Sequence, residues 1–144
     1  MTQLEAMKEI AKRGGGVITP AAVIRAARNP KHVLHGAFTW DDTEAAKKWR
    51  VLEAQRLIRR FTIETVADNG ETVTHPVFIG VSSDRDGASE NNPYRLAEDV
   101  AKNEDLLAIA EKDALDQLKA IESRFRHLTR LGKIWAAIDE IQDD

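Results

Sequence analysis

Apolar residues recur every three or four positions along most of the chain, a spacing typical of amphipathic helices. The first such pattern predicts a short helix at the N-terminus, and the glycines at 14–16 predict a flexible joint that would let it move as an arm. Thr19-Pro20 combines an N-cap with a first-turn proline and predicts a second helix over 20–28. We therefore expect an N-terminal helix with a glycine-rich joint over residues 1–16 and a single globular domain over 17–144.

A central basic helix is predicted from Asp42 to Arg60, with Asp41 and Glu44 forming a capping box at its start. Its apolar positions fall into two half-stripes on nearly opposite sides of the helix. Trp49 and Leu52 belong to the first half-stripe. The second contains Ala54, Leu57, Ile58 and Phe61. We expect Trp49 and Leu52 to be buried against a different partner, and three arginines to be at least partly exposed: Arg56, Arg59 and Arg60.

After this helix the apolar period changes to two, which indicates strands over 61–66 and 72–81. The Asn69-Gly70 pair between them predicts a β-hairpin. With these two residues as the loop, Val66 would face Val73 across the strands.

A polar loop over 82–92 and a short helix over 94–101 are predicted next, before Asn103 caps the longest helix. The apolar stripe of that helix consists of Leu107, Ala110, Ala114, Leu118, Ile121, Phe125 and Leu128. Unbroken to residue 141, the helix would be about 57 Å long, against roughly 35–40 Å for a compact globule of this size. Either Gly132 breaks the helix, or its end projects and meets another chain. The predicted fold is α+β and mainly α, with short N-terminal helices, one hairpin and a long C-terminal helix from about residue 104.

Charge divides the chain into two parts. Residues 1–61 contain 12 Lys and Arg against 6 Asp and Glu, and residues 62–144 contain 9 against 18. Such a split indicates either a nucleic-acid-binding face or attraction between the two halves. The chain has no cysteine, no apolar run long enough for a membrane span and no secretory signal, so an intracellular protein is expected.

No group of residues satisfies the requirements of a catalytic or metal site. His32 and His35 lie near Asp41 and Asp42, but an irregular loop gives such a ligand pair no fixed geometry, and a hydrogen-bonding His35 is the better interpretation. The Asp84 loop has a proline where a calcium loop ends in glutamate. We expect no enzymatic activity, no cofactor and no metal.

The chain as a whole resembles small proteins encoded by bacteriophages and prophages, a family without an assigned activity. The resemblance involves Ile18-Thr19-Pro20, the segment from Leu34 to Asp42, Ala45-Ala46, Arg50, Leu57-Ile58 and the closing helix. It implies a phage-type accessory protein in the cytoplasm of a bacterial host.

The first functional hypothesis is nucleic-acid binding, with DNA as the partner, through the central helix. Basic side chains there would neutralise phosphates rather than read bases. The candidates are Lys47, Lys48, Arg56, Arg59 and Arg60, with Arg25, Arg28 and Lys31 alongside.

The alternative is a protein-interaction or assembly module that works through the C-terminal helix, and the acidic pI near 5.8 favours it. The partner would be another phage or host protein, or a second copy in a symmetric dimer. The predicted interface consists of Phe125, Leu128, Ile134, Trp135, Ile138 and Ile141.

Overall fold

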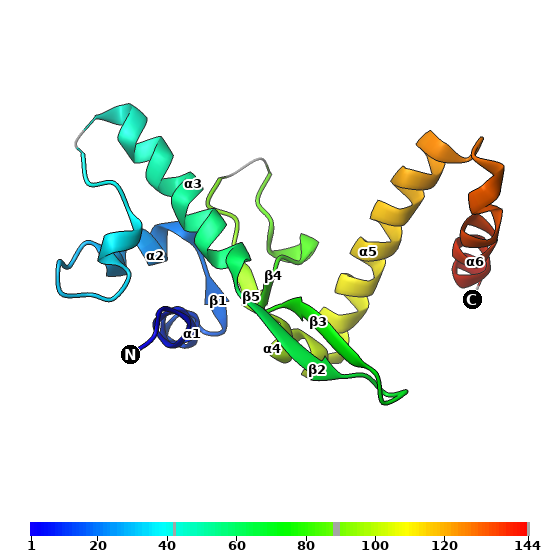
Figure 1. Cartoon of the computed structure of the whole chain (residues 1–144), viewed down its shortest axis with the longest axis horizontal. Coiled ribbons are helices and arrows are strands. Elements are labelled where there is room, and N and C mark those ends of the chain that lie inside the picture. Colours follow the sequence, from blue (N-terminus) through cyan, green and yellow to red (C-terminus); the bar gives the residue numbers. More distant parts are fainter. Residues whose placement is uncertain (42, 88–89, 144) are drawn as a thin grey trace.

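The computed structural model describes residues 1–41, 43–87 and 90–143. Its elements in chain order are α1 (Gln3–Arg13), β1 (Val17–Ile18), α2 (Pro20–Ala27), η1 (His35–Ala37), α3 (Glu44–Arg60), β2 (Thr62–Val66), β3 (Thr72–Pro76), β4 (Phe78–Ile79), η2 (Ser82–Asp84), β5 (Tyr94–Leu96), α4 (Ala97–Lys102), α5 (Glu104–Phe125), η3 (Thr129–Leu131) and α6 (Gly132–Asp143). The fold is α+β and mainly helical, as predicted. Figure 1 shows a body built from the first three helices and short strands, from which α5 projects with α6 alongside its far end.

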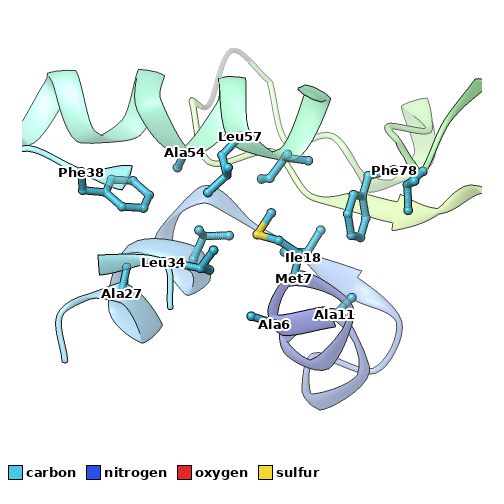
Figure 2. Close-up of a cluster of buried hydrophobic side chains, with 13 residues drawn as sticks. Ala6, Met7, Ala11, Ile18, Ala27, Leu34, Phe38, Ala54, Leu57 and Phe78 are labelled. Carbon is cyan, nitrogen blue, oxygen red and sulfur yellow. The ribbon is translucent and has the colours of Figure 1, made fainter. Parts of the chain in front are cut away.

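The core of the body lies between α1, α2, α3 and the three-stranded sheet β1-β5-β4. Met7, Ile18, Leu34 and Phe78 converge there with almost no exposed surface (Figure 2). Helix α1 is therefore an integral part of the core, which corrects the expectation of a separate arm. The glycines form a tight turn rather than a flexible joint: the Gly16 N–H donates to the Ala11 carbonyl at 2.8 Å.

The hairpin β2-β3 forms as predicted, but its register differs by one residue. Thr65 pairs with Val73, and Val66 pairs with Thr72. The loop has three residues rather than two, because the Ala67 N–H donates to the Glu71 carbonyl at 2.8 Å. Gly70 adopts a φ of 85°, as the last residue of a three-residue hairpin loop requires.

The predicted strand over 72–81 is divided at Val77. β3 ends at Pro76, which has no N–H for a ladder bond, and β4 then joins the other sheet by pairing with β5. β5 corrects the predicted helix over 94–101, since helix α4 begins only at Ala97. Tyr94 to Leu96 lie between β1 and β4, and pairing on both sides outweighs the local helix signal after Pro93.

The C-terminal part is a helical arm, defined here as α5, η3 and α6 (Figure 1). The Asn103 side chain accepts from the Leu106 N–H at 3.1 Å and so caps α5 as predicted. The long helix is broken, but at Phe125 rather than at Gly132, which is the first residue of α6. Within the described ranges, no helix is both long and apolar enough to span a bilayer.

Candidate interaction surfaces

Helix α3 starts two residues later than predicted, at Glu44 instead of Asp42. The Thr43 hydroxyl accepts from the Ala46 N–H at 3.2 Å, and the Asp41 carboxylate accepts from the Thr43 N–H at 3.0 Å. Thr43 is therefore the N-cap, and Asp41 orders the residue before the helix instead of capping it. Asp42, the predicted first residue, lies outside the described residues.

The prediction that Trp49 and Leu52 are buried is wrong, since each has 43% of its surface exposed. Among the described elements, α3 makes its main contacts with α2 and β4, and these contacts leave Trp49 and Leu52 partly exposed. Ala46 and Arg50 cover the inner side there instead of the larger apolar residues.

Arg50 is 4% exposed, although it lies in the most basic helix of the chain. Its Nη1 donates to the carbonyls of Thr39 at 2.9 Å and Asp41 at 2.7 Å, and its guanidinium lies 5.4 Å from the Trp40 ring centre. One turn later, the Glu53 carboxylate accepts from the Thr39 N–H at 3.0 Å and hydroxyl at 2.9 Å. These two charged side chains attach the connecting loop to α3.

Three arginines of α3 are exposed, as predicted. The Arg56 guanidinium lies over the Trp49 ring at 5.1 Å. Arg59 donates to the Tyr94 hydroxyl at 3.0 Å, and Arg60 donates to the Gln3 side-chain oxygen at 3.2 Å. Of the described carboxylates, none lies within ion-pair distance of these three side chains.

The remaining predicted cations lie on the first half of α3, on α2 and just after α2. Lys47 pairs with Glu44 at 2.9 Å, while Lys48 is exposed without a described ion pair. Arg28 approaches the Trp40 ring at 5.9 Å, from the end of α2. Arg25 and Lys31 are also exposed. The exposed side of α3 thus combines cations with an aromatic ring, Trp49.

His35 has a structural environment. Its Nδ1 donates to the Ala27 carbonyl at 2.7 Å, and its ring stacks on Trp40 at 4.9 Å and 9° between planes. The Trp40 Nε1 in turn donates to the His35 carbonyl at 2.9 Å. The described residues bring no three His, Asp or Glu side chains together as a metal site.

The second candidate surface is the apolar stripe of α5, defined here as Leu107, Ala114, Leu118, Ile121 and Phe125. Its large side chains remain 38–42% exposed. Helix α6 contacts α5 beside the stripe, where Arg126 bridges Glu122 at 3.0 Å and Asp139 at 3.7 Å. The chain therefore folds back on itself and still leaves the stripe partly exposed.

The residues predicted as an oligomer interface have two different environments. Trp135 and Ile138 are buried within the arm, at 7% and 3% exposure, and the Trp135 Nε1 has no hydrogen-bond partner among the described residues. Phe125, Leu128, Ile134 and Ile141 are 41–59% exposed. Only the exposed residues are available to a partner.

Near its middle, α5 is attached to the body by Asp113, whose carboxylate accepts from the Ser82 N–H at 2.8 Å. Hydrogen bonds from Ser82 hold the pKa of Asp113 below its ordinary value, and the positive charge of Arg85 acts in the same direction. Among the described elements, α5 makes its main contacts with α4, η2 and α6, and the large side chains of the stripe remain 38–42% exposed beside them.

Charge is distributed unevenly along the arm. Residues 104–116 contain five acidic residues and one lysine, whereas residues 117–133 contain five basic residues and one glutamate. Within α5 itself, which ends at Phe125, the first half is acidic, whereas residues 117–125 contain Lys119 and Arg124 against Glu122.

Comparisons of the chain with protein-family models, curated proteins and solved structures found no match. The geometry of these surfaces is thus the basis for assigning a function.

The sequence pattern did not reveal the structural use of Arg50 and Glu53. Charged residues three apart in a helix are usually solvent-exposed, and their partners lie in an irregular loop. The burial of Glu122 was missed as well, because a charged residue is expected to be exposed; it lies beneath α6 and is 6% exposed. The signal available for Glu122 was its spacing of four from Arg126, an intrahelical ion pair.

Proposed function

We propose that this protein is an assembly module that pairs with a second copy of itself through the stripe of α5. The observation that supports this most strongly is the exposure of four large apolar side chains, in a row, on a helix that projects from the body. A contiguous exposed apolar surface of this kind is typical of interaction sites.

The spacing within the stripe suits helix-to-helix pairing. Leu107, Ala114 and Ile121 are seven residues apart, and Leu118 and Phe125 each follow by four. This is the alternation of four and three that places side chains along a coiled-coil seam. Ala114, small and central, allows the two helices to approach closely.

Charge favours an antiparallel pair. Antiparallel α5 helices would place the acidic first half of one helix, residues 104–116, beside the second half of the other, residues 117–125, which carries Lys119 and Arg124 against Glu122. A parallel pair would place like charges together, which is destabilising. In the antiparallel arrangement the two copies use the same surface around a two-fold axis, so assembly ends with two chains.

Sedimentation measurements test the pairing. The full chain should sediment as a dimer at tens of micromolar, and Leu118→Ser with Ile121→Ser should sediment as a folded monomer. The control is Leu52→Ser, because Leu52 is as exposed as Leu118, at 43% against 42%, but lies on α3. A wild-type mass of one chain, or equal dissociation by the control, would refute the proposal.

Disulfide trapping tests the direction, because the chain has no cysteine of its own. Ala110, Gln117 and Arg124 follow one edge of the stripe at intervals of seven. In an antiparallel dimer, Gln117→Cys should cross-link with itself, whereas Ala110→Cys should cross-link only when mixed with Arg124→Cys. Efficient self-cross-linking of Ala110→Cys alone would instead indicate a parallel pair.

Nucleic-acid binding by α3 is the second candidate, and the exposed Trp49 beside Arg56 specifically favours it. Exposed aromatic rings among cations stack on bases while the cations neutralise phosphates, as in proteins that bind single strands. This also gives a use for an exposed tryptophan that helix packing does not explain.

Fluorescence anisotropy with a labelled single-stranded oligonucleotide, at about 50 mM salt, tests this candidate. Lys48→Glu with Arg56→Glu should abolish binding, and Trp49→Ala should weaken it. Lys12→Glu with Arg13→Glu on α1 makes the same change of charge elsewhere and should have little effect. Absence of wild-type binding, or an equal loss in the control, would eliminate this candidate.

A further inference from the structure

A polar cleft of about 740 Å³ lies where the arm meets the body. It is bounded by the second half of α3, by β4 and β5, and by α5. Its lining includes Gln55, Arg59, Arg85, Asn92, Tyr94 and Gln117. Two arginines in one cleft of this size indicate a site for an anionic ligand, since small-molecule sites have volumes of about 300–1,000 Å³.

The cleft holds Arg59 in place through one of its five N–H donors. The Nε donates to the Tyr94 hydroxyl at 3.0 Å, and the guanidinium lies 5.9 Å from the Tyr94 ring centre. This leaves both terminal nitrogens available. Among the described residues, none accepts from them or forms an ion pair with them.

Arg85 lies over the backbone of Gly80 on the other side of the lining. Its Nη2 would be only 3.5 Å from a Cβ at Gly80, so the missing side chain gives the guanidinium space. Its acidic neighbour Asp84 binds Arg95 instead, with two bonds of 2.6 Å and 3.0 Å. That bond raises the pKa of Arg95 and occupies the Asp84 carboxylate.

The charge of the cleft remains positive. Glu90 is the acidic residue of its lining, and its backbone carbonyl accepts from the Gln55 amide at 2.9 Å. The charge of Arg85 also acts on Asp113, but the Asp113 carboxylate already accepts a hydrogen bond from Ser82. Two arginines therefore face one glutamate.

We propose that this cleft binds a phosphate-bearing small molecule, with Arg59 and Arg85 donating to its phosphate oxygens. The planar guanidinium presents paired N–H groups that match two oxygens of a phosphate. The side-chain amides of Gln55, Asn92 and Gln117 would contact the remainder of the ligand. This site is separate from the exposed side of α3 around Trp49, and it adjoins the edge of the α5 stripe at Gln117.

Calorimetric titration of the full chain with pyrophosphate and with ADP tests the proposal at low salt. We expect saturable binding of one molecule per chain. Arg85→Gln and Arg59→Gln should each weaken it about tenfold, roughly 1.4 kcal/mol. Arg59→Lys keeps the charge but loses the planar guanidinium with its paired N–H groups. Its affinity for pyrophosphate should lie between those of the wild type and Arg59→Gln. Circular dichroism confirms that each variant is folded.

Arg56→Gln is the matched control, because Arg56 lies on the same helix but does not line the cleft. Equal losses in Arg56→Gln and Arg85→Gln would overturn the proposal, since they would indicate unspecific attraction to positive charge. Absence of binding at about 10 mM pyrophosphate would overturn it as well. An oligonucleotide that competes with pyrophosphate, and loses affinity with Arg85→Gln, would assign the arginines to a nucleic-acid strand and contradict a small-molecule site.

Discussion

Replacing Arg50 with leucine should destabilise the body more than any other single change of a cation on α3. Arg50 is 4% exposed and donates through Nη1 to the carbonyls of Thr39 and Asp41. Leucine fills part of the same space but cannot donate. The substitution therefore removes both bonds that attach the loop before α3, while preserving helix propensity.

The magnitude follows from these two bonds. A hydrogen bond from a charged group contributes about 1.5–3 kcal/mol. Thr39 and Asp41 are themselves exposed, so water can reach their carbonyls and offset part of the loss. We expect the free energy of unfolding to fall by about 2–3 kcal/mol, which corresponds to a fall in melting temperature of roughly 4–12 °C.

Urea denaturation followed by circular dichroism measures this loss, at a protein concentration below that of dimer formation, because association adds its own stability. Arg56→Leu is the control: it makes the same chemical change on the same helix, at an exposed residue with no described hydrogen bond. A loss below about 1 kcal/mol for Arg50→Leu, or an equal loss in the control, would refute the structural assignment of Arg50.

Three further substitutions test local features. Gly70→Ala should cost about 1–2 kcal/mol in thermal unfolding, because Gly70 has a φ of 85° that alanine disfavours; an unchanged melting temperature would contradict this turn. Thr43→Ala should cost about 1 kcal/mol by loss of the N-cap, whereas Asp41→Ala should cost less if Thr43 is the cap. Asp113 has a lowered pKa when folded, so its contribution is complete above its ordinary value of about 3.9 and is lost as pH falls through the lowered value. Asp113→Asn should therefore reduce the loss of unfolding free energy that the protein shows as the pH is lowered into the acid range. An unchanged acid dependence would exclude this linkage.

Local signals in the sequence predicted the features that depend on a few neighbouring residues. The Asn103 cap, the hairpin and the exposed arginines of α3 are confirmed. Each depends on chemistry within about four positions, such as a side-chain acceptor near free N–H groups. The hairpin register was missed because Asn-Gly also fits a three-residue loop with glycine last, and the loop length sets the pairing.

Features that depend on distant partners were not predictable in this way. Trp49 has the spacing of a buried residue, but whether a helix has a second neighbour is decided elsewhere in the chain. Tyr94 to Leu96 form a central strand only because β1 and β4 lie on either side of them. The cleft could not be predicted for the same reason. It brings together Arg59 of α3 and Arg85 of a distant loop, and no local pattern in the sequence relates the two.

The arm and the cleft share helix α5, so the two proposals are not energetically separate. Gln117 lines the cleft and also lies on the edge of the stripe, seven residues after Ala110. A ligand in the cleft would therefore contact the same helix that the second copy covers. Linkage requires any effect of the ligand on pairing to equal the effect of pairing on ligand affinity. Pyrophosphate should accordingly change the dimer dissociation constant of the wild type by the factor by which dimerisation changes pyrophosphate affinity. The Leu118→Ser with Ile121→Ser variant supplies the pyrophosphate affinity of the unpaired chain for this comparison.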